Sequence, residues 1–374
     1  MKILLDMTPC GRGTSIWVYA LRILKSWRDA DIGDVKIRLL IKEEAEQIIQ
    51  TEFPNFEYVV FKPYTYNNSV AALFRYSWFI VGREWRKIVD EQFDCDIYVS
   101  LALDSSSYRR IRLYRVQVVH DLQPLRVWRG RMRLLFRFLI PKLLKHSDRI
   151  IAITEFVKQD ILKTYPFISA EKISVVHNGV AVQRVTDSFQ KDLDCKYLLY
   201  VSTLFEYKNV GTLVKSFIEL KDKIPHKLVI VGKSTPYWEN AVLPMIKEHG
   251  VENRVVHLSH YVSDEDIIRL YQSADIFISP SLHEGFGYTP IEAAICGTPV
   301  ICTKETALPE VTMGLLNYYE PALDAIALKS KIEEVLNNYP TDEQLKKISD
   351  IFKAKYDITQ QAMKFLNVLV QCSK

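Results

Sequence analysis

The sequence predicts an α/β protein of two domains, each built on a doubly wound parallel sheet. Short strands rich in β-branched residues alternate with helical segments, which is typical of parallel sheets. This alternation starts again near residue 197, and a chain of 374 residues is long for a single hydrophobic core. The composition, 48% hydrophobic and 25% charged, is that of a globular protein.

The first half opens with a buried strand at residues 1–7, a loop that contains Gly11 and Gly13, and a helix over residues 15–28. This order is typical of a nucleotide-binding fold, although the third glycine of a dinucleotide fingerprint is missing. Thr154 is expected to cap a later helix. Further strands are expected at residues 35–40, 58–61, 97–101, 116–120, 149–153 and 172–178.

The second half repeats this architecture. Helices are expected at residues 210–220 and 264–274, the latter with Ser263 as its cap. Strands are expected at residues 197–202, 227–232, 254–258, 275–279 and 300–302.

The polar stretch 179–191 has no clear periodicity and is the expected linker. It places an N-terminal domain at residues 1–185 and a C-terminal domain at residues 186–355. The remaining residues, 356–374, are expected to form a helix that packs back on the N-terminal domain.

The most informative stretch is residues 278–311, where a short apolar strand leads into a glycine-containing loop and then a helix over residues 290–296. Thr289 is the expected N-cap, Pro290 occupies the first helical position, and Glu292 would close a capping box. A glycine loop that leads into a helix N-terminus binds anions, because backbone N–H groups and the positive end of the helix dipole point at the ligand.

Two carboxylates, Glu284 and Glu292, flank this anion site. They are unexpected if the ligand is phosphate alone, but a carboxylate can bind two adjacent sugar hydroxyls. A nucleotide sugar carries both chemistries. The alternative is that Glu292 only caps the helix and Glu284 is a solvated loop residue.

The spacing of Glu284 and Glu292 within HEGFGYTPIEAAICGTPVI, continued by Ala307–Glu310, resembles the signature of the retaining GT-B glycosyltransferases of family 4. The resemblance implies two facing Rossmann-like domains with the ligand in the cleft between them. It implies that Glu284 contacts the donor sugar and Glu292 the ribose. The donor-binding residues that it implies are Gly13, Thr203, Lys208, Phe286, Gly287, Tyr288, Thr289 and Glu292.

His120 and Asp121 end a β-branched strand at its carboxyl end, where open α/β sheets bind ligands. A histidine bonded to the local backbone is the structural alternative. Family 4 enzymes have a similar histidine–aspartate pair, and the resemblance implies that His120 lies beside the transferred sugar. Asp121 is a further candidate site residue, and the alternative is that it only orients the loop.

Lys208 lies in the loop after the first strand of the second half, where its charge can reach a diphosphate. The segment LYVSTLFEYKN resembles the corresponding segment of family 4 enzymes. Many of these enzymes have an arginine where this chain has Ser202 and Thr203. The departure leaves one cation fewer at the leaving group.

Composition limits the remaining possibilities. The net charge of +4 does not imply a nucleic-acid partner, and the six cysteines form no CxxC pair. Asp94 and Asp96 have the spacing of a metal motif, but they open a buried strand. We therefore expect no metal and no cofactor. We see no signal peptide and no apolar run of about 20 residues, so we expect a cytoplasmic protein.

The segment Arg109–Arg149 is strongly basic. From residue 105 to 149 there are twelve lysines and arginines against two aspartates, interleaved with apolar residues such as Trp128 and Phe138. The segment is either a solvated helix face or a surface for peripheral contact with an anionic membrane. Membrane contact would suit a polyprenyl-diphosphate-linked acceptor.

The sequence therefore predicts a retaining hexosyltransferase that uses a nucleotide-sugar donor, with GDP-mannose as the first choice, and a glycan or lipid-linked oligosaccharide acceptor in surface-polysaccharide synthesis. One alternative is a non-catalytic partner subunit that binds nucleotide sugar. Another is a GT-B enzyme of different chemistry, such as a phosphorylase or a sugar-nucleotide epimerase.

Overall fold

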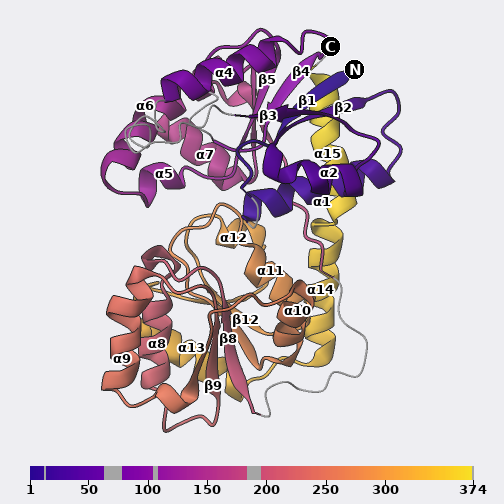
Figure 1. The fold of residues 1–374 in the computed structure, drawn as a ribbon. Coiled ribbons are helices and arrows are strands. Elements are labelled where there is room, and N and C mark those ends of the chain that lie inside the picture. The colour runs from indigo at the N-terminus through magenta and orange to yellow at the C-terminus, as the bar shows by residue number, and fades with distance from the viewer. Residues whose placement is uncertain (12–13, 63–77, 104–107, 183–194, 373–374) are drawn as a thin grey trace. The chain divides into compact units, whose positions relative to one another are not determined.

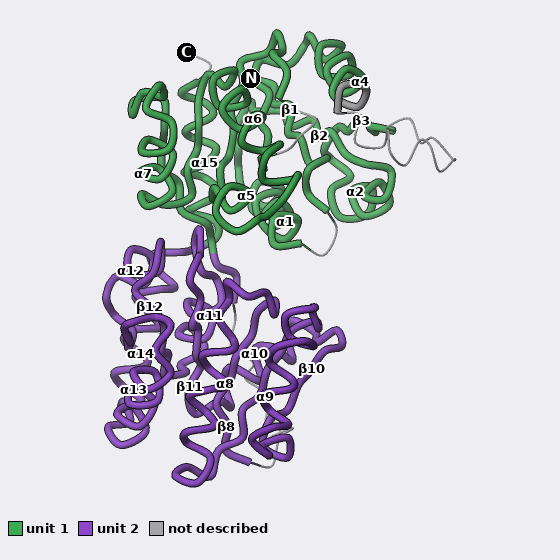
Figure 2. Tube along the Cα trace, turned by 90° about the vertical axis from the view of Figure 1, so that its left-hand side faces the viewer, with its two compact units in different colours: residues 1–179, 358–374 green, residues 180–357 purple. Residues whose placement is uncertain are grey.

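The computed structural model describes residues 1–11, 14–62, 78–103, 108–182 and 195–372. They form two compact units (Figure 2). Unit 1 consists of residues 1–179 and 358–374, and unit 2 of residues 180–357. Each unit holds one parallel sheet, so the predicted α/β class is confirmed.

The sheet of unit 1 has seven strands in the order β3-β2-β1-β4-β5-β6-β7, and every neighbouring pair is parallel. The order reverses between β1 and β4, as in doubly wound folds. The strands are β1 (Lys2–Asp6), β2 (Lys36–Lys42), β3 (Glu57–Phe61), β4 (Ile97–Ser100), β5 (Tyr114–Val119), β6 (Arg149–Ala152) and β7 (Ile173–Val175).

The helices of unit 1 alternate with these strands along the chain and lie on either side of the sheet (Figure 1). Thr154 caps α7 by accepting a hydrogen bond from the Val157 amide, as the sequence predicts. The α-helices are α1 (Ser15–Asp29), α2 (Glu46–Glu52), α4 (Trp78–Asp90), α5 (Gln123–Arg126), α6 (Gly130–His146) and α7 (Glu155–Thr164).

Helix α15 (Ile358–Gln371) also belongs to unit 1, although all of unit 2 precedes it in sequence. It packs on α1, where the Trp27 indole N–H donates to the Ala362 carbonyl at 3.0 Å. The rings of Trp27 and Phe365 stack with centroids 5.7 Å apart. The expected return of the last helix to the N-terminal domain is confirmed.

A buried carboxylate lies at the carboxyl end of β1. Asp6 is fully buried and accepts hydrogen bonds from the Trp85 indole N–H at 2.9 Å and the Tyr98 hydroxyl at 2.6 Å. Its other oxygen accepts from the amide and the hydroxyl of Thr8. With both oxygens bonded, Asp6 ties β1 to β4 and α4. The sequence analysis did not single it out.

The sheet of unit 2 has six strands in the order β10-β9-β8-β11-β12-β13, again all parallel. Its order reverses between β8 and β11. The last strand was not expected from the sequence. The strands are β8 (Tyr197–Val201), β9 (Lys227–Val231), β10 (Val255–Leu258), β11 (Ile276–Ser279), β12 (Val300–Thr303) and β13 (Asn317–Tyr319).

Ser263 caps α10 by accepting from the Asp266 amide, as predicted. Tyr356 and Asp357 separate the last two helices of the chain. The α-helices of unit 2 are α8 (Val210–Ile218), α9 (Leu243–Glu248), α10 (Asp264–Ser273), α11 (Tyr288–Ile295), α12 (Leu308–Val311), α13 (Ala325–Asn337) and α14 (Asp342–Lys355).

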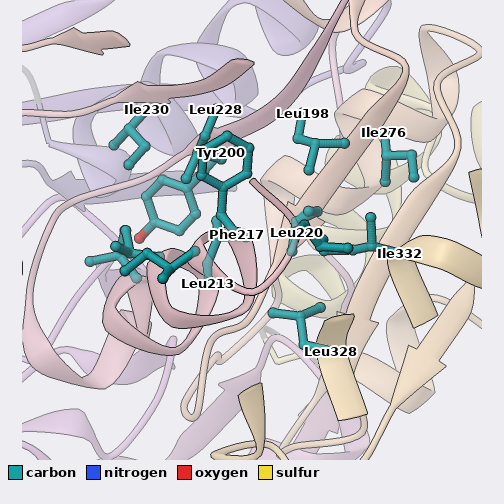
Figure 3. Packing of buried hydrophobic residues seen from close by; sticks show 14 of the residues in the cluster. Leu198, Tyr200, Leu213, Phe217, Leu220, Leu228, Ile230, Ile276, Leu328 and Ile332 are labelled. Carbon is teal, nitrogen blue, oxygen red and sulfur yellow. The ribbon is translucent and has the colours of Figure 1, made fainter. Parts of the chain in front are cut away.

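The core of unit 2 joins the sheet to α8 and α13. Figure 3 shows Phe217 of α8 near Leu228 and Ile230 of β9, with Leu328 and Ile332 of α13 in the same cluster. All five side chains are completely buried. This core holds the central strands of the sheet in place.

No helix in the described part of the chain is both long enough and apolar enough to span a membrane.

Candidate functional site

Two opposite charges meet where the strand order of unit 2 reverses. Lys208 follows β8 and Glu284 follows β11. Lys208 Nζ donates to Glu284 Oε1 at 2.6 Å, and their side chains are 14% and 15% exposed. Both line a narrow crevice between the loops that follow β8 and β11. Open α/β sheets bind ligands at such reversals, so this pair is the centre of the candidate site.

Asn209 fixes the loops that present the pair. It is 4% exposed, with a left-handed φ of 59°. Its amide donates to the carbonyls of Pro280 at 3.0 Å and Ala322 at 2.8 Å, and its Oδ1 accepts from the Thr212 hydroxyl at 2.7 Å. One buried side chain thus joins the loops after β8, β11 and β13. The sequence analysis missed it, although asparagine tolerates left-handed backbone better than most residues.

Helix α11 starts two residues earlier than the sequence predicts. Gly287, with φ 86°, is its N-cap, and among the described residues no side chain bonds to the first turn as a cap. The predicted capping box of Thr289 and Glu292 is therefore wrong. The physical reason is that glycine adopts positive φ without steric cost, so the chain turns into the helix at Gly287. Pro290 still lies in the first turn.

The start of α11 has the geometry of an anion site. The first backbone N–H groups of a helix have no acceptor within the helix, and the positive end of its dipole lies there. Phe286 is 3% exposed and packs against the rings of Tyr288 and Tyr356, with centroids 5.0 and 5.2 Å away. A Cβ at Gly287 would lie 2.7 Å from Leu308 Cδ2, so a side chain does not fit there.

Glu292 is partly exposed on the second turn of α11. Its neighbour is the phenol of Tyr271 on α10. Burial, and after it the charge of Glu292, raises the pKa of Tyr271 well above its usual value. Because Glu292 does not cap the helix, contact with a ribose hydroxyl stays a prediction.

His120 follows β5 in unit 1. Its Nε2 lies 2.9 Å from the Leu101 carbonyl, and its ring contacts Tyr19 edge-on at 4.8 Å. Desolvation by burial lowers the pKa of His120 to about 4, although the bond to Leu101 acts in the other direction. The ring is therefore neutral at neutral pH. A carbonyl only accepts, so Nε2 carries the proton and Nδ1 is left as an acceptor.

Two aspartate motifs have structural partners. Asp121 accepts from the Gln123 amide at 2.8 Å and so shapes the start of α5. Asp94 pairs with Lys2 and Arg38, which lower its pKa below the usual range. Among the described residues, no three His, Cys, Asp or Glu side chains gather as a metal site.

The other expected donor-binding residues differ in their surroundings. Phe286, Gly287, Tyr288 and Thr289 lie together at the start of α11, close in sequence to Glu284. Thr203 is exposed, and its carbonyl accepts from the Tyr200 hydroxyl at 3.1 Å. The expected contact at Gly13 lies outside the described residues.

The two halves of the chain match models of the two domains of one enzyme family. Residues 41–184 match the model described as Glycosyltransferase Family 4, and residues 183–350 match the one described as Glycosyl transferases group 1. The second match contains Lys208, Glu284 and Glu292. The chain belongs to the GT-B glycosyltransferases of family 4. The family resemblance noted in the sequence is thereby confirmed.

Curated relatives of this glycosyltransferase include O-antigen enzymes. It is 27% identical over 329 residues to O-antigen chain mannosyltransferase RfbU from Salmonella typhimurium, covering 85% of this chain and 87% of that protein. It is 36% identical over 117 residues to O-antigen chain mannosyltransferase B from Escherichia coli, covering 31% and 30%, respectively.

Solved structures share the fold of this glycosyltransferase. A sucrose-phosphate synthase from Thermosynechococcus elongatus has a TM-score of 0.76 at 17% identity, covering 99% of this chain and 98% of that one. HepE from Anabaena, solved with UDP and glucose, has a TM-score of 0.76 at 18% identity, covering 99% and 100%. These similarities establish the GT-B fold.

Proposed function

We propose that this glycosyltransferase moves a hexosyl group from a nucleoside-diphosphate sugar to a glycan or lipid-linked oligosaccharide, with retention of configuration. The proposed donor is GDP-mannose and the proposed pathway is surface-polysaccharide synthesis. The support is the match over most of the chain to RfbU, whose name describes an O-antigen mannosyltransferase.

The observation that carries the proposal is the Lys208–Glu284 pair beside the start of α11. The two groups lie 2.6 Å apart at the strand reversal of unit 2. Lys208 and the first amides of α11 suit a diphosphate, and Glu284 suits sugar hydroxyls. We infer that the bound donor replaces the direct pair, so that Lys208 turns to phosphate oxygens and Glu284 to the sugar.

In the proposed reaction the bond between the sugar's anomeric carbon and the leaving phosphate oxygen breaks. The acceptor oxygen forms its bond to that carbon on the same face, and the acceptor proton passes to the leaving phosphate. Lys208 and the α11 amides stabilise the charge that develops on the diphosphate. His120, neutral with Nδ1 as an acceptor, takes a hydrogen bond from a sugar hydroxyl.

A panel of donors tests the assignment. Purified protein is incubated with GDP-mannose and with UDP-, dTDP- and ADP-sugars, and thermal shift and nucleoside-diphosphate release are recorded. We expect GDP-mannose to raise the melting temperature most. A larger shift with another nucleotide would refute the GDP assignment. Donor binding without diphosphate release, with any glycan acceptor, would favour the non-catalytic subunit, which the absence of an arginine at Thr203 makes the second candidate.

Substitution of Glu284 tests the site itself. Glu284→Gln is expected to lower kcat by at least about 100-fold, because removing one group that stabilises a transition state costs two to three orders of magnitude. Glu248→Gln, at the exposed end of α9, is the matched control and should keep wild-type kcat. If Glu284→Gln keeps a near-normal rate, Glu284 is not in the site.

Substitution of Lys208 separates binding from chemistry. Lys208→Ala is expected to raise the Kd for nucleoside diphosphate by about 10-fold, the loss of one charge-assisted hydrogen bond. Because the variant leaves the largely buried Glu284 without its partner, some loss of melting temperature is also expected, and the affinity is therefore measured well below the melting temperature of the variant. Calorimetric titration with GDP gives the Kd. An unchanged Kd would remove Lys208 from the diphosphate site.

A further inference from the structure

The outer surface of α6 combines exposed apolar side chains with cations. Leu134 and Phe138 are 57% and 61% exposed, and Trp128 and Met132 are each 38% exposed. Figure 2 shows α5 and α6 at the front of unit 1. Burying apolar surface is favourable, so a cluster of exposed apolar residues of this size marks an interaction surface.

Helical geometry places Leu134 and Phe138 on one face of α6, whereas Met132 lies on another side and Trp128 precedes the helix. Phe136, Leu139, Ile140, Leu143 and Leu144 are buried and form the inner side of α6. Successive residues of a helix turn by about 100°, so the positions opposite are 131, 134, 138, 142 and 145. They hold Leu134 and Phe138 between cations, all of them exposed: Arg131, Lys142 and Lys145. Exposed Arg137 lies at one border of the face, and exposed Arg133 lies farther round the helix, nearer its buried side.

Opposite charges are absent from this part of the sequence. Residues 122–147 contain seven lysines and arginines and no aspartate or glutamate. Among the ion pairs of the described residues, none involves Arg131, Arg133, Arg137, Lys142 or Lys145. Arg126 differs, because it pairs with Asp160 on α7. The positive charges of this face are therefore exposed to solvent and available to an anionic partner.

We propose that this face of α6 binds the surface of an anionic lipid bilayer, with Leu134 and Phe138 inserted at the headgroup level and the surrounding cations on lipid phosphates. An amphipathic helix with cations around an apolar centre binds such surfaces in this way. The apolar centre favours a bilayer over a nucleic acid, because exposed leucine and phenylalanine side chains can be buried in a bilayer but not against a phosphate backbone. This surface of α6 is independent of the proposed transfer reaction.

Vesicle binding tests the proposal on the whole protein. We expect sedimentation with vesicles of phosphatidylglycerol and phosphatidylcholine at low salt, and none with pure phosphatidylcholine. Each cation near an anionic surface contributes about a factor of five to binding, so Arg131→Glu/Lys142→Glu/Lys145→Glu should lower partitioning by at least about 100-fold. Leu134→Ser/Phe138→Ser should lower it while leaving all charges in place.

A matched control changes the same net charge elsewhere. Lys247→Glu/Lys347→Glu/Lys353→Glu replaces three exposed lysines on helices of unit 2 and should bind vesicles like the wild type. Unaltered melting temperatures show that the variants fold. If the wild type does not bind anionic vesicles, or if the charge-reversal variant of α6 binds as well as the control, the proposal is wrong. The proposal is also wrong if charge reversal weakens vesicle binding, Leu134→Ser/Phe138→Ser does not, and the protein binds heparin in the same way. Such a result would show a general affinity for polyanions.

Discussion

His120 is held as a neutral ring, and this determines how it can act. The Leu101 carbonyl fixes the proton on Nε2, and burial keeps the pKa near 4. In the proposed reaction, a cationic ring would repel the positive charge that develops on the glycosyl group as its phosphate leaves. A neutral ring instead offers Nδ1 as an acceptor for a hydroxyl. The bond from Nε2 to the backbone and the proposed contact of Nδ1 with a sugar hydroxyl are thus compatible.

The lowered pKa makes stability depend on pH. The folded-state pKa of about 4 lies below the unfolded value of about 6.5, so the unfolded chain binds the proton more readily. The contribution of His120 is complete above pH 6.5 and is lost as pH falls toward about 4. Near pH 5 the loss is about 2 kcal/mol.

Urea unfolding of the wild type and of His120→Gln measures this effect. Between about pH 7.5 and pH 5, the free energy of unfolding of the wild type should fall by about 2 kcal/mol relative to that of His120→Gln, because glutamine does not titrate. Parallel pH profiles for the two proteins would contradict the assignment of a buried neutral ring.

Single residues were predictable where their surroundings are local. Glu284 and His120 follow strands that the sequence shows plainly, and strand ends are where such sheets bind ligands. The contact between Lys208 and Glu284 was not predictable from the pattern, because it depends on β8 and β11 being neighbours. Asp6 and Asn209 were missed for the same reason, since their partners come from distant strands and loops.

At the scale of elements, α11 shows where propensity rules fail. Threonine, proline and glutamate in that order fit a capping box, yet the preceding glycine starts the helix. The local sequence is compatible with a helix that starts at either residue. Packing decided between them, because Phe286 is buried against Tyr356 and fixes the chain just before the helix.

Gly287→Ala tests this junction. The substitution meets Leu308 at 2.7 Å and a left-handed φ of 86°, so we expect a loss of about 2 kcal/mol or more and weaker binding of nucleoside diphosphate. Gly314→Ala is the control, because φ is 69° there but nothing lies within 4 Å of the new Cβ. It should cost about 1 kcal/mol and leave diphosphate binding intact. Equal melting temperatures and equal affinities for the two variants would refute the close approach.

At the scale of the molecule, the two sheets and their helices were predictable because buried parallel strands read as continuous apolar runs. The short strand β13 was missed, since three residues give no periodicity. The return of α15 to unit 1 was expected from its apolar face. Its contacts show that it completes the core beside α1. Trp27 and Phe365 are each 1% exposed.

Phe365→Ala is expected to destabilise unit 1 by about 3–5 kcal/mol, the usual cost of removing a buried phenylalanine. Phe93→Ala, at a site 87% exposed, is the control and should change stability by less than about 0.5 kcal/mol. Hydrogen exchange measured by mass spectrometry should show faster exchange in α1 of Phe365→Ala. Exchange equal to that of the control would mean that α15 contributes little to unit 1.

The return of α15 also sets an order of events during synthesis. Unit 2 is one continuous stretch of chain and can complete its core as soon as it leaves the ribosome, since domains generally fold as units. Unit 1 begins earlier but must wait, with the apolar side of α1 uncovered, until residues 358–371 emerge. The half translated first is therefore completed last, and a nascent chain arrested inside unit 2 lacks the helix that covers Trp27 of α1.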